Sequence, residues 1–224
     1  MTTLVVATLS AREVGRRRAA LALVIALPFW FYLVRRDLTG QSTRMLTLGI
    51  GWAVSTLTLF VVNASRSVDP RLRLAGAPVG SIIGGRLLAM TGVGAGIAAG
   101  YWTLAALDQD LPHAWAAGLM MAVTAVVAAP LGSLIGALLP RELEGALALL
   151  SVCAVQMLAD PQGVVAKLMP FWSAREIGNY AVDGGGIGLV GRGLAHAAIV
   201  WLVCTGVTLA VYGWRWRVAR YPEP

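Results

Sequence analysis

Six apolar runs, separated by short segments that hold nearly all of the charged residues, constrain this chain more than any other feature of its sequence. The runs lie near residues 19–34, 45–64, 84–107, 114–139, 146–160 and 194–214. An α-helix rises about 1.5 Å per residue, so roughly 20 residues cross the hydrocarbon core of a bilayer. We therefore predict an all-α polytopic membrane protein, a single transmembrane domain over residues 1–224 with six transmembrane helices.

The composition fits a membrane protein better than a soluble one. Hydrophobic residues make up 58% of the chain and charged residues 13%, whereas soluble domains carry about 25% charged residues. The net charge of +7 comes almost entirely from arginines that lie between apolar runs, so it does not indicate nucleic-acid binding. The runs at 19–34 and 146–160 are short, and we expect arginine side chains or neighbouring protein to cover their ends.

The distribution of basic residues predicts the orientation of the helices, because cytoplasmic segments of membrane proteins are enriched in arginine and lysine. Alternate segments, counted from the N-terminus, hold twelve arginines, and the intervening segments hold six basic residues. The first group is Arg12, Arg16, Arg17, Arg18, Arg66, Arg71, Arg73, Arg86, Arg141, Arg215, Arg217 and Arg220, and the second is Arg35, Arg36, Arg44, Lys167, Arg175 and Arg192. Both termini are therefore predicted to be cytoplasmic.

Two segments are expected to lie at the membrane surface. Residues 3–18 combine apolar side chains with an arginine cluster and predict an interfacial helix. Arg35-Arg36-Asp37 rather than a small-residue cleavage site follows the first run, so we expect a retained span and not a signal peptide. Residues 161–193 are too apolar for a solvated loop and are interrupted by Pro170 and glycines, which predicts a broken, partly re-entrant outer hairpin.

A short cytoplasmic helix is predicted near 68–78, between the second and third runs. Asp69 can cap free N–H groups and Pro70 fits the first helical position. Gly76 and Pro78 are typical of a helix end. The helix would present Arg71, Leu72, Arg73 and Leu74 to a partner. The alternative is a loop that serves only to set the topology.

Catalytic motifs are weak. Gly186, Gly188 and Gly191 match G-x-G-x-x-G, but no strand precedes them, and no Walker A sequence surrounds Lys167. Ser133 and His196 lie in the fourth and sixth runs, as in rhomboid-type proteases. Their predicted depths differ by about 20 Å, too far for a nucleophile and its base. No catalytic or metal site is predicted, and Cys153 and Cys204 are expected to be buried thiols.

Small residues mark one face of the third run. Gly92, Gly96 and Gly100 are spaced by four and match the small-xxx-small pattern of close helix packing. The contact would form either within the subunit or between two subunits.

The chain resembles the integral-membrane permeases of type-2 ABC transporters. Four features carry the resemblance: the basic N-terminal segment, the six runs, the segment DPRLRLAGAPVGSIIGGRLLA after the second run, and LMPFWSAREIGNYAVDGG after the fifth. In that family the first of these segments is a coupling helix that docks on an ATPase subunit, and the second is an external hairpin near the outer gate. The short first outer loop departs from many relatives and disfavours a large external domain.

The resemblance implies a permease subunit of an ATP-driven exporter in a bacterial cell membrane, with a drug-like, lipid or lipid-linked substrate. ATP and Mg²⁺ would bind to a separate ATPase subunit, no cofactor would bind to this chain, and a second permease subunit, identical or paralogous, would complete the pathway. The outer gate would include Pro170, Phe171, Trp172, Arg175 and Glu176, and the pathway lining Trp52, Thr56, Phe60, Gln156 and Met157. The alternatives are a six-helix carrier that works without ATP and an intramembrane enzyme.

Overall fold

The computed structural model describes residues 3–16, 18–38, 40–160 and 163–216, and within these residues helices are joined by turns and short connections, without strands. The helices are α1 (Thr3–Arg16), α2 (Arg18–Val34), α3 (Gln41–Ala64), α4 (Asp69–Leu74), α5 (Val79–Asp108), α6 (Ala114–Leu138), α7 (Glu142–Leu158), α8 (Val164–Leu168), α9 (Trp172–Asp183) and α10 (Gly188–Arg215). The predicted all-α class is confirmed.

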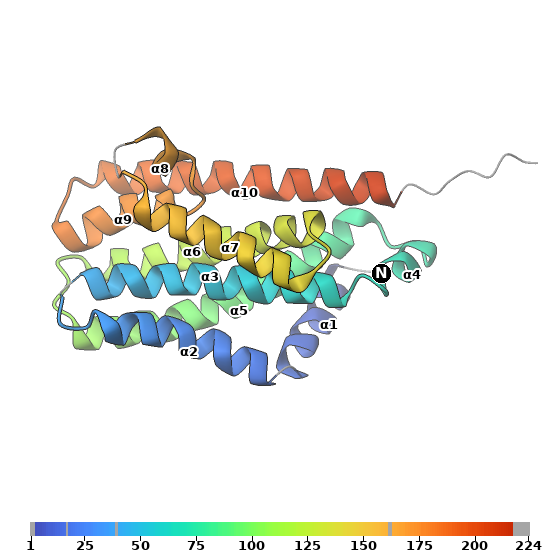
Figure 1. The fold of residues 1–224 in the computed structure, drawn as a ribbon, viewed down its shortest axis with the longest axis horizontal. Coiled ribbons are helices and arrows are strands. Elements are labelled where there is room, and N and C mark those ends of the chain that lie inside the picture. The colour runs from blue at the N-terminus through green and yellow to red at the C-terminus, as the bar shows by residue number, and fades with distance from the viewer. Residues whose placement is uncertain (1–2, 17, 39, 161–162, 217–224) are drawn as a thin grey trace, which may run out of the picture.

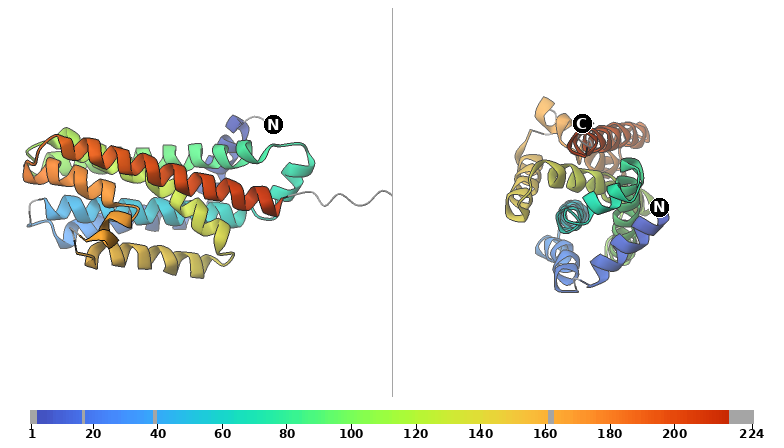
Figure 2. Two further views of the ribbon diagram at one scale, coloured as in Figure 1. Left: turned by 90° about the horizontal axis from the view of Figure 1, so that it is seen from above. Right: turned by 90° about the vertical axis from the view of Figure 1, so that its right-hand side faces the viewer.

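The long helices α2, α3, α5, α6, α7 and α10 run along one axis, and α3 lies at the centre of the bundle (Figures 1 and 2). The most apolar window of α3 is 78% buried inside the protein, against 67% for α6 and 17% for α10. Because α3 packs against α2, α5, α6 and α7, almost all of its side chains are enclosed by protein. Most of the apolar surface of α10 is exposed, as is that of a lipid-facing helix.

Glycines allow the central helices to approach one another closely. A Cβ atom on Gly132 of α6 would lie 2.1 Å from the carbonyl oxygen of Ser55 on α3. A Cβ atom on Gly49 of α3 would lie 2.8 Å from the Cα atom of Pro28 on α2. Buried Thr47 and Thr58 of α3 satisfy their hydroxyl groups by donating to the backbone carbonyls of Thr43 and Val54. These two threonines are thus tolerated in the core because their own helix supplies the partners.

Within the described part of the chain, four helices are long and apolar enough to cross a membrane: α3, α5, α6 and α10. The bent pair of α1 and α2, with an angle of 75° between Thr3–Arg16 and Leu21–Val34, would make a fifth if counted as one span. The predicted runs 19–34 and 146–160 correspond to α2 and α7, which are helices of 17 residues each. The structure therefore describes a membrane protein with four or five candidate spans.

Several helices begin earlier than the apolar runs predicted. The runs starting at 45, 84, 146 and 194 become helices that start at Gln41, Val79, Glu142 and Gly188. The predicted hairpin 161–193 is therefore too long, because its last residues form the first turns of α10, and residues 161–162 lie outside the described residues. A helix continues through polar and glycine residues as long as its backbone hydrogen bonds continue, whereas a hydropathy pattern ends with the apolar side chains.

The two ends of the bundle differ in charge. We name the end that carries α1, α4 and the α6–α7 connection the arginine-rich end, and the end that carries α8 and α9 the hairpin end (Figure 1). Among the described residues, the arginine-rich end holds Arg12, Arg16, Arg18, Arg66, Arg71, Arg73, Arg86, Arg141 and Arg215 with Glu13, Asp69, Glu142 and Glu144. The hairpin end holds Arg35, Arg36, Arg44, Lys167, Arg175 and Arg192 with Asp37, Asp108, Asp110, Asp160, Glu176 and Asp183. The chain thus brings its predicted cytoplasmic arginines to one end, apart from Arg17, Arg217 and Arg220, which lie outside the described residues.

The N-terminal helix α1 lies across the arginine-rich end of α5. Val6, Ser10 and Val14 of α1 are buried, and Gly85 of α5 leaves room for this contact, since a Cβ atom there would lie 2.6 Å from the carbonyl oxygen of Thr3. The other side of α1 exposes Leu4 and Leu9. The predicted helix over 3–18 is present over residues 3–16, with one face on the protein and a second apolar face uncovered.

Candidate functional site

The first candidate site is the short helix α4 at the arginine-rich end. The helix begins at Asp69, one residue before the predicted first helical residue Pro70, and it ends at Leu74, so it is shorter than the predicted segment 68–78. Gly76 adopts a φ angle of +86°, and the N–H groups of Gly76 and Ala77 bind the carbonyls of Arg73 and Leu72. This is a Schellman-type end that favours glycine. Pro78 is the N-cap residue of α5, so it starts the next helix and is not part of α4.

Asp69 does not cap α4, which corrects the sequence prediction. The N-cap position belongs to Val68, and no side chain caps the helix. The Asp69 carboxylate instead accepts hydrogen bonds from both terminal nitrogens of Arg86 on α5, with Nη1 3.0 Å from Oδ2. The side chains of Asp69 and Arg86 are only 1% and 3% exposed. A carboxylate bound by a guanidinium in this bidentate way is held in a fixed orientation, so α4 is fastened to α5.

The two leucines of α4 have different surroundings. Leu74 is 83% exposed, whereas Leu72 is partly buried. Val68, just before the helix, is exposed as well. Arg71 is exposed, but Arg73 donates from Nη1 to the carbonyl of Ala77 at 2.7 Å. The exposed residues in and next to α4 therefore include Val68, Pro70, Arg71 and Leu74, whereas Leu72 and Arg73 of the predicted row 71–74 are partly buried.

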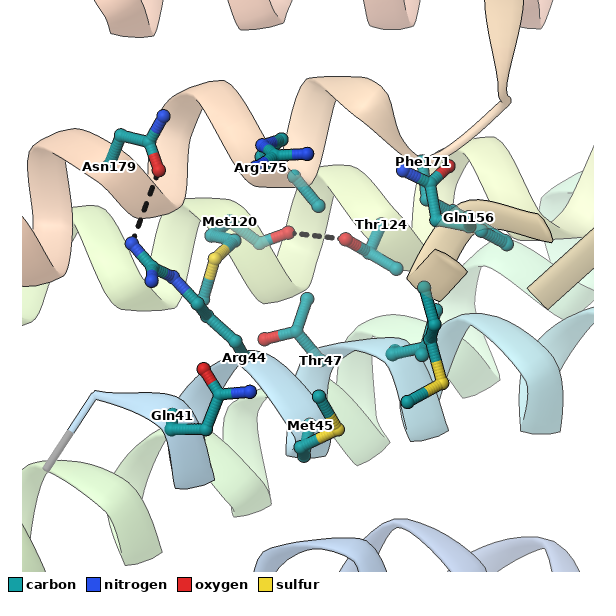
Figure 3. Close-up of a pocket in the computed structure, with 13 residues that line it drawn as sticks. Gln41, Arg44, Met45, Thr47, Met120, Thr124, Gln156, Phe171, Arg175 and Asn179 are labelled. Atoms are coloured by element: carbon teal, nitrogen blue, oxygen red, sulfur yellow. Dashed lines mark hydrogen bonds between the residues drawn. The ribbon is translucent and has the colours of Figure 1, made fainter. Parts of the chain in front are cut away.

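The second candidate site is a cavity of about 220 Å³ at the hairpin end, between α3, α6, α7 and α9 (Figure 3). Two groups of predicted residues meet there. Gln156 and Met157, predicted as pathway lining, reach it from α7, and Phe171 and Arg175, predicted as part of the outer gate, reach it from the start of α9. The sequence placed these residues in separate segments, and the tertiary structure brings them into one cavity.

Other predicted residues lie away from the cavity. Trp52, Thr56 and Phe60 do not line it and follow it along α3 toward the arginine-rich end. Pro170 is partly buried in the turn before α9, and the Trp172 ring lies 5.1 Å from the His196 ring of α10. Glu176 is 8% exposed and its Oε2 atom lies 3.2 Å from Nε of Arg192 on α10. Arg175 and Glu176 are thus neighbours in sequence that face different parts of the protein.

Arg44 and Asn179 line the cavity and were not predicted as site residues. Nη2 of Arg44 donates to Oδ1 of Asn179 at 3.1 Å, as Figure 3 shows, and also to Asp183. Arg44 comes directly before the second apolar run, so the sequence counted it as a loop charge. A helix predicted to start at Gln41 would have identified Arg44, because it puts Gln41, Arg44 and Leu48 on one face of α3.

Asp108 is the centre of a second polar group at the hairpin end. Asp108 accepts hydrogen bonds from the Tyr32 hydroxyl and from the Arg36 guanidinium, whose Nε lies 3.0 Å from Oδ2. The hydrogen bond to Asp108 and the attraction of its charge raise the pKa of Arg36 above its usual range. This group ties the end of α2 to the end of α5 and lies apart from the cavity lining.

Ser133 and His196 do not form a catalytic pair. Ser133 is buried near the arginine-rich end of α6, and its hydroxyl has no hydrogen-bond partner among the described residues. His196 lies near the hairpin end of α10, where Nε2 contacts the carbonyl of Lys167 at 3.0 Å. Gly186, Gly188 and Gly191 lead into and begin α10 without a preceding strand. Within the described ranges, no three His, Cys, Asp or Glu side chains are grouped to hold a metal ion.

The glycine face of α5 is not used inside the subunit. A Cβ atom on Gly92, Gly96 or Gly100 would have no neighbouring atom within 4 Å among the described residues. Of the two contacts that the sequence left open, a packing contact within the subunit is therefore excluded for this conformation.

No protein-family model matches the sequence, and neither does any curated protein.

Proposed function

We propose that this chain is the membrane-spanning permease subunit of an ATP-driven exporter of the type-2 ABC kind. One observation carries the proposal: α4 is a short helix at the arginine-rich end that is fastened to α5 by the buried pair Asp69–Arg86 and leaves Leu74 83% exposed. A segment that only sets topology needs arginines but has no need of a buried ion pair and an exposed apolar tip. A docking helix that must move its transmembrane neighbour requires both.

In this function the arginine-rich end faces the cytoplasm, and a separate ATPase subunit, which binds ATP and Mg²⁺, contacts Leu74, Val68 and Arg71. Movement of the ATPase pushes α4, and the Asp69–Arg86 pair passes this movement to the start of α5. Because α5 packs against α3 and α6, whose other ends line the cavity, a tilt of α5 alters the cavity at the opposite end. Two permease subunits form the complete pathway.

All six long helices cross the membrane in this proposal, with α1 at the cytoplasmic surface and α8 and α9 at the outer surface. A helix of 17 residues spans about 25 Å, slightly less than the hydrocarbon core of about 30 Å. Arg18, Arg35 and Arg141 stand next to the ends of α2 and α7. Their long side chains can extend from the edge of the hydrocarbon core to the polar interface, so that these short helices can span the membrane.

The experiment that tests the proposal is replacement of Leu74 by Asp. Burial of one leucine in an interface is worth about 1.5–3 kcal/mol, so Leu74→Asp should weaken the association with the ATPase at least about tenfold. The chain is purified from native membranes with its associated subunits, and ATP hydrolysis is measured against a mock purification. The wild-type preparation should hydrolyse ATP, and the Leu74→Asp preparation should lose the activity while membrane insertion is unchanged.

Leu143→Asp is the matched control, because Leu143 is 72% exposed at the same end but belongs to α7. This variant should retain ATP hydrolysis. The proposal is wrong if the wild-type preparation hydrolyses no ATP above the mock level, or if Leu74→Asp hydrolyses it as fast as the control.

A further inference from the structure

The cavity at the hairpin end has an unbalanced charge. Arg44 of α3 and Arg175 of α9 both line it, and no aspartate or glutamate of the described residues does. The charge of Arg44 is partly neutralised by Asp183, whose side chain is 54% exposed and does not line the cavity. Arg175 forms no hydrogen bond or ion pair with any described residue. The cavity therefore has a net positive electrostatic potential, which attracts an anionic group.

A buried donor of the cavity lining lacks a partner inside the protein. Nε of Arg44 is buried without a hydrogen bond to any described residue. Such a group is costly to bury, which indicates that something else supplies the missing hydrogen bond. With the side-chain amide groups of Gln41 and Asn179 nearby (Figure 3), the cavity offers several donors for the oxygens of one headgroup.

Apart from Thr47 and Thr124, whose hydroxyl groups donate to backbone carbonyls of their own helices, the remaining lining is apolar. Met45 and Leu48 of α3, Met157 of α7 and the buried ring of Phe171 complete the cavity. Met157 is 54% exposed on the outer surface of α7, where Leu158 is 86% exposed. The apolar part of the cavity therefore continues to the exposed side of α7. This side faces lipid if α7 spans the membrane. Flexible methionine side chains accommodate alkyl chains of different shapes.

We propose that this cavity binds an amphipathic molecule with an anionic, phosphate-like or carboxylate headgroup, the headgroup between Arg44 and Arg175 and the apolar chain along Met45, Leu48 and Met157. Arginine suits this role because its planar guanidinium donates two parallel hydrogen bonds to such oxygens. The inference rests on the proposed function in that this molecule is the class of substrate exported. Cationic amphiphiles are rejected, since they would leave both guanidinium groups without a counter-charge.

The test uses dodecyl phosphate with a photoreactive diazirine on its alkyl chain and the purified full chain in phosphatidylcholine nanodiscs. Cross-links are mapped by mass spectrometry as the probe concentration is raised. We expect saturable cross-links in α3 and α7 near Met45 and Met157. Arg175→Gln should raise the half-saturating concentration about tenfold or more, because a charge-assisted hydrogen bond is lost. Arg175 has no internal partner, so this variant should fold normally.

Arg35→Gln is the matched control, since it removes the same charge from an exposed residue at the same end that does not line the cavity. It should bind the probe like the wild type. Inorganic phosphate at millimolar concentration should compete poorly, because it lacks the alkyl chain. Dodecyltrimethylammonium with the same diazirine should label the cavity weakly.

Equal labelling by the cationic probe, or equal half-saturation for Arg175→Gln and Arg35→Gln, would overturn the proposal. Full competition by inorganic phosphate would overturn the amphipathic assignment, because it would mean that a water-borne anion is the ligand. The assay contains no ATP and no ATPase, so its result is separate from that of Leu74→Asp. If the probe binds as expected but the Leu74→Asp experiment gives the result that contradicts the proposed function, the exporter is refuted and the ligand assignment remains.

Discussion

At the scale of single residues, Asp69 and Arg86 are the pair on which the candidate coupling site depends. Both side chains are almost completely buried, and removal of two charges from water costs several kcal/mol for each. The bidentate hydrogen bonds offset that cost only while both partners are present. The pair therefore fixes the position of α4 more than it adds to the stability of the whole protein.

This view predicts an asymmetry between single and double replacements. Asp69→Leu and Arg86→Met should each lower the stability by about 3–5 kcal/mol, because each leaves one buried charge without a partner. The double variant should recover most of the loss. Thermal unfolding in detergent can be followed with a thiol-reactive dye, since the free cysteines Cys153 and Cys204 are buried in the folded protein.

Arg141→Gln provides the comparison for these variants. Arg141 is 80% exposed and paired with Glu144 at the surface, so its loss should change the stability by about 1 kcal/mol or less. If the double variant is as unstable as the less stable single variant, the loss of stability does not come from a buried charge left without its partner.

At the scale of elements, α3 and α6 form the most extensive contact between two described helices, and a glycine makes the contact possible. The carbonyl of Ser55 occupies the space where a side chain on Gly132 would begin. The far end of α6 is held by arginines from its neighbours: Arg66 Nη2 donates to the carbonyl of Leu139 at 3.3 Å, and Arg215 Nη1 donates to that of Ala137 at 2.5 Å. Cations near a helix C-terminus also interact favourably with its dipole.

Gly132→Ala should therefore destabilise the bundle, because the new Cβ atom would lie 2.1 Å from the Ser55 carbonyl oxygen and backbone atoms must move. Overpacking of this kind costs about 1–3 kcal/mol. Gly96→Ala is the matched control on α5, where the Cβ atom meets nothing within 4 Å among the described residues. The control should be neutral or slightly more stable in the same thermal assay, since alanine favours a helix over glycine by about 1 kcal/mol. Equal effects of the two replacements would contradict the close α3–α6 contact.

At the scale of the whole molecule, the two ends of the bundle are electrically different. Described arginines outnumber acids at the arginine-rich end, and the basic and acidic residues of the hairpin end are equal in number. Segments rich in arginine and lysine stay in the cytoplasm when a membrane protein inserts. In the proposed exporter, the arrangement in Figure 1, with α4 at one end and α9 at the other, therefore predicts which surface would meet the ATPase and which would release substrate.

Single cysteines test this orientation. Asp110→Cys, in an exposed position at the hairpin end, should react in intact cells with a maleimide that cannot cross the membrane. Val68→Cys, in a position 47% exposed at the other end, should react only after the cells are opened. The wild-type protein reports the background, because Cys153 and Cys204 are buried. Labelling of Val68→Cys in intact cells would reverse the orientation and remove the proposed role of α4.

The sequence alone determined the helical class, the positions of the apolar helices, the start of α4 and the segregation of arginines. Each of these depends on local pattern: apolar runs in helices, proline and glycine at helix ends, and charges between spans. The exact helix starts at Gln41 and Gly188 were missed because hydropathy ends before backbone hydrogen bonding does.

Only the tertiary structure decided which distant residues meet. It paired Asp69 with Arg86 instead of with the backbone of α4, placed Arg44 beside Asn179, and separated Arg175 from Glu176. It also shows why Gly40 precedes α3: the residue has a φ angle of +79°, and a Cβ atom would lie 2.0 Å from Cγ1 of Val182. Partners that are far apart along the chain depend on how the helices pack, and packing is a property of all the side chains together.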